Sequence, residues 1–159
     1  MEGSPPVIDP GAVQNLVARW WWSYDEGHFD FLASHLTEDA HFVCRTDTGK
    51  TAWEEFVRAD IRGRDAFMAW QTQHRLESPY PLRHHGTNLH VVEQRGDEAT
   101  FACYILVMHI VNGQVSPLPG GIVNSAVRLV DGELCISELE VVLDTIDSDR
   151  FEDSRQLRR

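Results

Sequence analysis

The sequence is poor in the features that mark membrane proteins and nucleic-acid-binding proteins. No apolar run approaches the roughly eighteen residues that a transmembrane helix needs. Lys and Arg together number 14 against 25 Asp and Glu, which gives a formal net charge of −11. Because phosphate groups are bound by a surplus of basic residues, this balance argues against a nucleic-acid or anionic-membrane partner. At 159 residues, the chain is expected to form one domain.

Cysteine is scarce and scattered. Cys44, Cys103 and Cys135 are far apart, and each lies within an apolar segment. An odd number at such spacing predicts reduced thiols in the core rather than a disulfide or zinc framework. The first residues carry neither the basic start nor the apolar stretch of a secretory signal. We therefore expect a cytoplasmic protein.

The common motifs of metal and nucleotide sites are also missing. His84 and His90 are close in sequence, but on a strand they would lie about 20 Å apart, too far to share an ion. Gly49-Lys50-Thr51 lacks the leading glycine of a phosphate-binding loop, because Cys44 occupies that place. Gly120-Gly121 opens an expected strand and not a helix, and no Gly-x-Ser-x-Gly elbow occurs. By elimination, any catalysis is expected to be acid–base chemistry without a metal or cofactor.

The patterns that are present predict helices in the first part of the chain. One helix should begin at Asp9-Pro10 and end at Gly27, with apolar residues at helical spacing between them. A shorter helix should run through Leu36 and close at residues 37–39, followed by a strand over residues 40–45.

The second part of the chain is expected to consist mainly of strands. Residues 52–77 are still mostly helical in character, with a break at Gly63. Beyond them, four strands are expected, joined by turns at Gly96 and at Asp131-Gly132: residues 82–94, 99–111, 122–130 and 133–143. Helices followed by an antiparallel meander indicate an α+β fold, with N-terminal helices packed on one face of a curved sheet. A flexible tail over residues 1–9 and a charged tail over residues 147–159 would flank a domain over residues 10–146.

An aspartate and a histidine are the strongest candidates for catalytic residues. Asp25 lies one turn after Trp21 at the edge of the apolar stripe, where partial desolvation suits a general base. An Asp shortly before Gly more often bonds its own backbone, so both roles stay open. On the strand after the proline break, His84 and Asn88 would share a face unless a bulge at Gly86 changes the register. The opposite face could equally be the core.

The next strand and the tryptophans could complete a pocket. His109 shares a face with Cys103, whereas Tyr104 lies on the other face, and either polar residue could contribute to an apolar cavity. The tryptophans suit the lining of a pocket for a flat apolar substrate, although aromatic residues are more often core. They are Trp20, Trp21, Trp22, Trp53 and Trp70.

Five short motifs occur in an order that resembles the SnoaL-like group of cone-shaped α+β barrel proteins, over roughly residues 10–145. They are a Tyr-Asp-x-x-x-Phe-Asp stretch (residues 24–30), a Gly-Arg-Asp-Ala helix start (Gly63–Ala66), an Arg-His-x-x-Thr-Asn strand start (Arg83–Asn88), a Gly-Asp hairpin (Gly96-Asp97) and an Asp-Gly hairpin (Asp131-Gly132). The superfamily includes ketosteroid isomerase, scytalone dehydratase and nuclear transport factor 2.

The resemblance implies an Asp–His catalytic dyad in an apolar pocket, formed here by Asp25 and His84. It also implies a substrate-contacting role for Tyr24 and for a second histidine at His109, with His85 as a substitute for His84 if the register slips.

The implied activity is that of a cofactor-independent dehydratase, isomerase or cyclase that acts on a hydrophobic cyclic or polyketide-like molecule. We expect Trp21, Asn88 and Tyr104 to contact this substrate as well. Homodimers or homotrimers are expected. Two other members of the superfamily give the alternatives: a non-catalytic binding or dimerisation module, and the small subunit of a ring-hydroxylating dioxygenase.

Overall fold

The computed structural model describes residues 7–154, in which helices come before most of the strands. The helices are α1 (Pro10–Glu26), α2 (Phe29–Ser34), α3 (Glu54–Val57), α4 (Arg64–Glu77) and α5 (Phe151–Ser154). The strands are β1 (Leu36–Thr46), β2 (Ala59–Arg62), β3 (Leu82–Arg95), β4 (Glu98–Val111), β5 (Gln114–Val130) and β6 (Glu133–Leu143). No helix in residues 7–154 is long and apolar enough to cross a membrane. Residues 1–6 and 155–159 of the two expected tails lie outside the described part.

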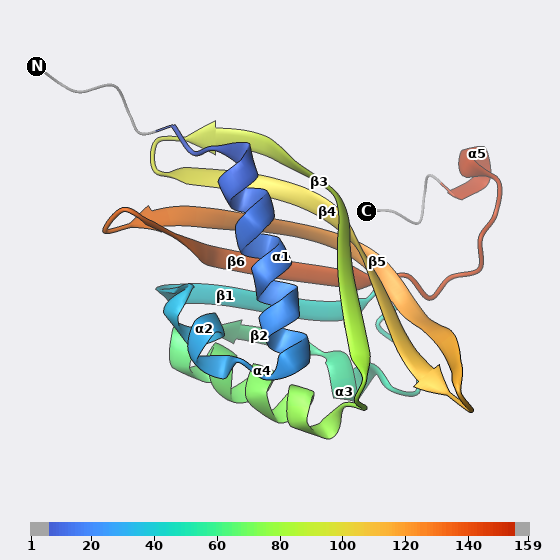
Figure 1. Cartoon of the computed structure of the whole chain (residues 1–159). Helices are drawn as coiled ribbons and strands as arrows, with labels where there is room; N and C mark the ends of the chain where they lie inside the picture. Colours follow the sequence, from blue (N-terminus) through green and yellow to red (C-terminus); the bar gives the residue numbers. More distant parts are fainter. Residues whose placement is uncertain (1–6, 155–159) are drawn as a thin grey trace, which may run out of the picture.

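The strands form one six-stranded sheet in the order β2-β1-β6-β5-β4-β3 (Figure 1). Strand β1 pairs parallel with β6, and all the other pairs are antiparallel. The α+β fold with a curved, mostly antiparallel sheet is therefore confirmed. The sheet does not close into a barrel, because β2 and β3 are its two edges.

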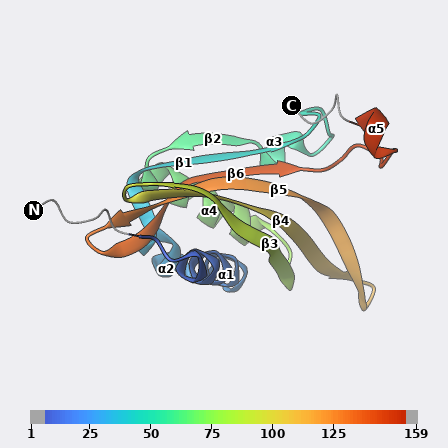
Figure 2. The ribbon, with the colours of Figure 1, turned by 90° about the horizontal axis from the view of Figure 1, so that it is seen from above.

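The long helices cover one face of this sheet. Seen from above in Figure 2, α1, α2 and α4 lie on the same side of the strands. Helix α1 packs on β3, while α4 packs on β1. The core lies between the helices and the sheet and contains Cys44 and Cys103. All three cysteines are buried, unpaired thiols, as predicted.

Helix α1 has the ends that the sequence indicates. The Asp9 side chain accepts a hydrogen bond from the main-chain N–H of Gly11 over 3.0 Å, which satisfies one of the free donors of the first turn. Gly27 ends the helix with φ of 73°, a left-handed conformation that glycine adopts without a steric penalty. The buried apolar and aromatic residues between these ends make one continuous stripe: Val13, Leu16, Val17, Trp20, Trp21 and Tyr24.

Two short segments differ from the sequence-based expectation. Residues 36–39 belong to β1 and not to the end of a helix, because Leu36 pairs with Ile136 of β6. The main-chain carbonyl of His35 also accepts the Ile136 N–H over 2.8 Å. Within the segment that was expected to be mostly helical, β2 forms an edge strand antiparallel to β1. Its four residues are too few for a clear alternation.

Strand β5 begins eight residues earlier than expected, at Gln114 instead of Ile122. This first part pairs only with β4, because pairing with β6 starts at Gly121. Pro117 is tolerated there since its missing N–H would face no partner strand. At Gly121 the backbones come so close that an added Cβ would lie 2.1 Å from the carbonyl oxygen of Val142.

Candidate active site

A largely apolar cavity of about 440 Å³ lies between the sheet and the helices. This volume is within the range of small-molecule sites, which bury an apolar ligand and orient it with a few polar groups. The polar lining residues come from α1, α4 and the ends of β3 and β4: Tyr24, Gln71, His74, Ser78, His84 and His109. The aromatic lining residues that accompany them are Trp21, Phe42, Trp53, Phe56 and Trp70.

Asp25 sits in the last turn of α1 and is only 5% exposed. The carbonyl groups of a last helical turn have no intrahelical partner, and here a buried arginine of α4 supplies one. The Arg75 guanidinium donates to the main-chain oxygen of Asp25 over 2.8 and 3.1 Å, and to that of Tyr24 over 3.1 Å. Because the guanidinium occupies the main-chain oxygens, the Asp25 carboxylate remains available to the strand opposite.

Both oxygens of this carboxylate bind His84. The main-chain N–H of His84 donates to Oδ2 over 2.8 Å, and the ring nitrogen Nδ1 donates to Oδ1 over 2.6 Å. The carboxylate thus fixes the position of the residue and the tautomer of its ring. Nε2 is the ring nitrogen that remains available to a molecule in the cavity.

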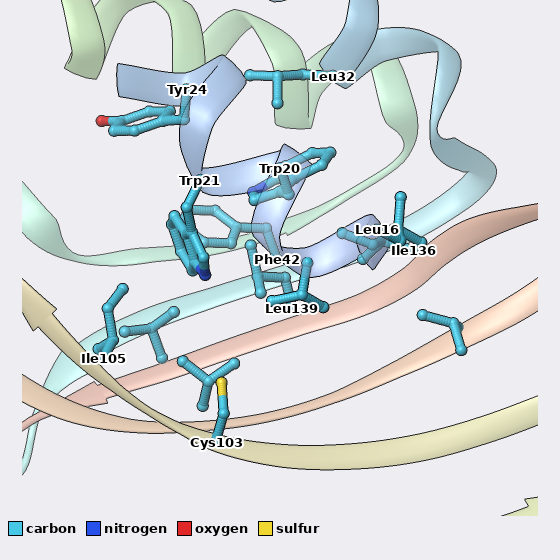
Figure 3. Packing of buried hydrophobic residues seen from close by; sticks show 14 of the residues in the cluster. Leu16, Trp20, Trp21, Tyr24, Leu32, Phe42, Cys103, Ile105, Ile136 and Leu139 are labelled. Carbon is cyan, nitrogen blue, oxygen red and sulfur yellow. The ribbon is translucent and has the colours of Figure 1, made fainter. Parts of the chain in front are cut away.

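Aromatic contacts hold the His84 ring in place. Trp21 stacks on it with centroids 5.2 Å apart and an interplanar angle of 13°, while Tyr24 meets it edge-on at 5.2 Å. Trp21 points from α1 towards the sheet (Figure 3). It passes directly over Gly86, where an added Cβ would lie 3.3 Å from Cδ1 of the indole. The missing side chain at Gly86 therefore leaves the space that Trp21 occupies beside His84.

A second histidine, which sequence reasoning did not single out as a site residue, lines the same cavity. His74 of α4 has Nδ1 2.6 Å from the Tyr24 hydroxyl oxygen. Its ring stacks on Trp70, with centroids 4.5 Å apart, and contacts Phe56 at the same distance. The only signal in the sequence was its position one helical turn after Trp70, which puts both side chains on one face of α4.

Burial sets the protonation of the polar residues around this second histidine. Desolvation, with a smaller contribution from the nearby His84, lowers the pKa of His74 to about 4. Desolvation also raises the pKa of Tyr24 well above its ordinary value, although Arg75 opposes this. The same cause raises the pKa of the Cys44 thiol in the cavity wall to about 12. At neutral pH these three groups are therefore uncharged.

The structure brings together five of the eight residues named from the sequence and separates the other three from the cavity. Asp25 contacts His84, and the other three, Trp21, Tyr24 and His109, line the cavity with His84. His85 points to the exposed face of β3, and Tyr104, which is 53% exposed, lies on the corresponding face of β4.

Asn88 is the third residue outside the cavity, and here the expectation that it shares a face with His84 is wrong. A bulge lies between Thr87 and His90, because these residues pair with Tyr104 and Ala102 of β4. Asn88 adopts φ of 57° within this bulge and is exposed. The extra residue shifts the alternation, so Leu89 takes a place against the core.

The tryptophans divide between core, pocket and surface. Trp21, Trp53 and Trp70 line the cavity, as the pocket interpretation expected. Trp20 is completely buried in the core, and Trp22 is 66% exposed. Within the described residues, no three His, Cys, Asp or Glu side chains lie close enough together to hold a metal ion.

Comparison with solved structures supports the same fold. The chain is 21% identical to a nuclear transport factor 2-like protein with a cystatin-like fold from Novosphingobium aromaticivorans (TM-score 0.69, covering 94% of this chain and 88% of that one). It is 19% identical to a scytalone dehydratase-like protein from the same organism (TM-score 0.67, covering 87% of this chain and 85% of that one). It is also 19% identical to the β subunit of benzoate 1,2-dioxygenase from Burkholderia mallei (TM-score 0.67, covering 89% of this chain and 97% of that one).

No curated protein matches the chain. The model of the SnoaL-like domain, however, matches residues 6–140, which include Asp25, His84 and every helix and strand of the cavity wall up to β6. This protein belongs to the family of SnoaL-like domains.

Proposed function

We propose that this protein is a cofactor-independent acid–base enzyme of the dehydratase, isomerase or cyclase type. Its substrate would be a hydrophobic cyclic or polyketide-like molecule bound in the cavity. The observation that carries the proposal is the attachment of both Asp25 carboxylate oxygens to His84. A carboxylate that orients an imidazole and stabilises its protonated form makes the other ring nitrogen an effective base.

The proposed reaction begins with proton transfer to Nε2 of His84 from a carbon next to a carbonyl group. The electron pair of that C–H bond moves into a new carbon–carbon double bond, and the carbonyl oxygen takes up the negative charge. In an elimination, the His84 proton then leaves with the hydroxyl group of the neighbouring carbon as water. In an isomerisation, the proton returns to a different carbon. Asp25 stabilises the positive charge that His84 carries between the two steps.

The cavity wall supports this chemistry in two ways. Its aromatic surface excludes water from the reacting atoms, which strengthens the electrostatic effect of the carboxylate. Tyr24 and His109 are the lining residues that could hold the substrate oxygen. His85, Asn88 and Tyr104 are left out of this proposal because of their exposed positions.

The first test is exchange of a carbon-bound proton. We expect wild-type protein in D₂O to exchange the protons next to the carbonyl of 1-tetralone, or of cyclic hydroxy-ketones in a panel, faster than buffer does. Proton NMR measures this rate without requiring the natural substrate. The variants Asp25→Asn and His84→Ala should return the exchange to the buffer rate, provided that circular dichroism shows them folded. Equal exchange in wild type and His84→Ala would refute the dyad.

A second candidate function is that of a non-catalytic subunit of a larger enzyme. The specific observation in its favour is the likeness to the β subunit of benzoate 1,2-dioxygenase, of which 97% is covered. Such a subunit would assemble with a large partner chain. Sedimentation of the purified protein distinguishes the two: a catalytically active assembly of this chain alone supports the enzyme.

We also propose that the protein forms homodimers or homotrimers. The support is the outer face of β4, where two large apolar side chains are exposed. Tyr104 and Leu106 lie two residues apart on this face and are 53% and 54% exposed. Exposed apolar side chains that lie together mark association surfaces. Leu106→Arg should shift the sedimentation coefficient to that of a monomer, and an unchanged coefficient would exclude this face.

A further inference from the structure

Two hydroxyl groups lie beside His74 at the α4 side of the cavity. The Ser78 hydroxyl donates to the main-chain oxygen of His74 over 2.6 Å, so its single proton is used there. The Tyr24 hydroxyl oxygen lies 2.6 Å from Nδ1 of His74, and one of these two atoms must donate.

The tautomer of His74 decides the direction of this contact. Nε2 of the ring is buried and has no hydrogen-bond partner within residues 7–154. An unpaired N–H would be costlier to bury there, so the hydrogen belongs on Nδ1. The Nδ1–H of His74 therefore donates to the Tyr24 oxygen, and the Tyr24 hydroxyl proton is not used in this contact.

We propose that His74 is a positioning residue that donates to the Tyr24 oxygen and turns the Tyr24 hydroxyl proton towards a carbonyl or hydroxyl oxygen of the bound molecule. A ligand oxygen beside Tyr24 then accepts this proton. The inference rests on the proposed function only in taking the cavity as the binding site, and it does not depend on proton transfer by His84.

The surroundings of His74 fit a neutral donor. Its ring is fixed by the stack on Trp70 and the contact with Phe56, so Nδ1 keeps its direction. No carboxylate within the described residues bonds to this ring, in contrast to His84. Burial keeps its pKa near 4, and a neutral imidazole has one N–H to donate. Two of the histidines that line the cavity therefore have different roles: His84 receives a proton, and His74 orients a hydroxyl group.

The test uses two bicyclic probes that differ by one oxygen, 1-tetralone and tetralin. Quenching of the cavity tryptophans reports the dissociation constant of each probe. The measured quantity is the ratio of the tetralin constant to the 1-tetralone constant, which cancels the apolar contribution that the two probes share. Loss of one neutral hydrogen bond corresponds to roughly a fivefold change in this ratio.

Four variants separate a positioning role from a structural one. Tyr24→Phe should lower the ratio about fivefold, and His74→Phe, which keeps a ring between Trp70 and Phe56, should lower it about threefold. His74→Asn should restore most of the loss, because its amide places a donor near the position of Nδ1. The double variant Tyr24→Phe/His74→Phe should be no worse than Tyr24→Phe alone, since His74 acts through the Tyr24 hydroxyl.

The opposite direction of donation gives the opposite sign. If Tyr24 donated to His74, then His74→Phe would release the hydroxyl proton and the ratio would rise. A rise, or an additive loss in the double variant, overturns the inference. The ¹⁵N chemical shifts of the His74 ring give an independent reading: a protonated Nδ1 supports the proposal, and a protonated Nε2 contradicts it.

These outcomes are distinct from a failure of the proposed catalysis. If His84→Ala keeps full proton exchange while the ratio still depends on His74, the dyad is wrong and the inference about His74 stands. If neither probe binds to the wild-type protein, the cavity is not the binding site and both proposals fall.

Discussion

Residues 7–154 contain two aspartate–histidine pairs with nearly the same contact distance, and the aspartates of the two pairs differ strongly in exposure. In the cavity, Nδ1 of His84 lies 2.6 Å from Asp25 Oδ1. At one side of the sheet, Nε2 of His41 on β1 lies 2.7 Å from Asp60 Oδ1 on the edge strand β2. The side chains of Asp25 and Asp60 are 6% and 78% exposed. A short contact between an acid and an imidazole is therefore not sufficient to identify a catalytic site.

Two further differences separate the pairs. Asp25 also accepts the main-chain N–H of His84, so its second oxygen is engaged, while the Asp60 carboxylate is largely in water. Low dielectric surroundings strengthen the interaction of the buried pair, and solvent screens that of the exposed pair. Moreover, His84 lines the cavity and His41 does not. We expect the two pairs to respond very differently to the same substitutions.

The largest expected difference is in catalysis. His84→Ala should lower kcat/KM, or the rate of proton exchange, by roughly 10²–10⁴-fold, because the general base is lost. His41→Ala is the matched control and should leave the rate within about twofold of the wild type. Rates of both variants on the same ketone panel test this. Comparable losses in the two variants would mean that the rate follows general stability and not the cavity pair.

The next effect is on stability. Asp25→Asn replaces one of the two oxygens that accept hydrogen bonds from His84 by an NH₂ group that can only donate, which leaves a buried donor unpaired. We expect this change to lower the free energy of unfolding by roughly 1–3 kcal/mol. Asp60→Asn should change it by about 0.5 kcal/mol or less. Urea denaturation followed by fluorescence measures both values, and equal losses would remove the distinction between the pairs.

Much of the arrangement that separates the two pairs could be predicted from local sequence signals. Asp9 and Gly27 mark the ends of α1, and this places Asp25 in the last turn beside the apolar stripe. The order of five short motifs then predicts that Asp25 meets His84. Each of these signals acts within a few residues or depends on the order of elements, so a single sequence is enough to recognise it.

The parts that could not be predicted depend on long-range pairing. Strand β2 exists because β1 offers it an edge, and its four residues carry little signal of their own. The bulge at Asn88 is a property of the register between β3 and β4, which strict alternation of faces does not anticipate. His74 resembles any polar residue on an amphipathic helix until the fold places it 2.6 Å from Tyr24.

A third histidine, His74, differs from the histidines of both pairs in its expected effect on the pH dependence of stability. No carboxylate among the described residues forms a hydrogen bond with His74, and burial lowers its pKa from 6.5 to about 4 even though Glu77 opposes this shift. The unfolded chain therefore binds a proton more readily than the folded chain between these two values. The contribution of the neutral His74 ring to the free energy of unfolding is therefore fully present above pH 6.5 and is lost as the pH falls towards 4.

His74→Phe should remove this part of the pH dependence. Between pH 6.5 and 4, we expect the wild type to lose roughly 1–3 kcal/mol more than the variant does, because the variant has no imidazole to protonate. Thermal unfolding of both proteins at a series of pH values measures the difference. Parallel pH profiles would show that the His74 ring protonates as easily in the folded protein as in the unfolded chain.

The smallest expected effect concerns the surface pair itself. A double-mutant cycle with His41→Ala and Asp60→Ala should give a coupling energy of about 0.2–1 kcal/mol near neutral pH, because the Asp60 carboxylate is in water. The coupling should decrease further in about 1 M salt, where the screening length is close to the contact distance. The same cycle on Asp25 and His84 should give a larger value that salt changes little, since solvent reaches neither side chain freely. If the surface coupling were as large and as insensitive to salt as the buried one, burial could not be the reason that only one pair is suited to catalysis.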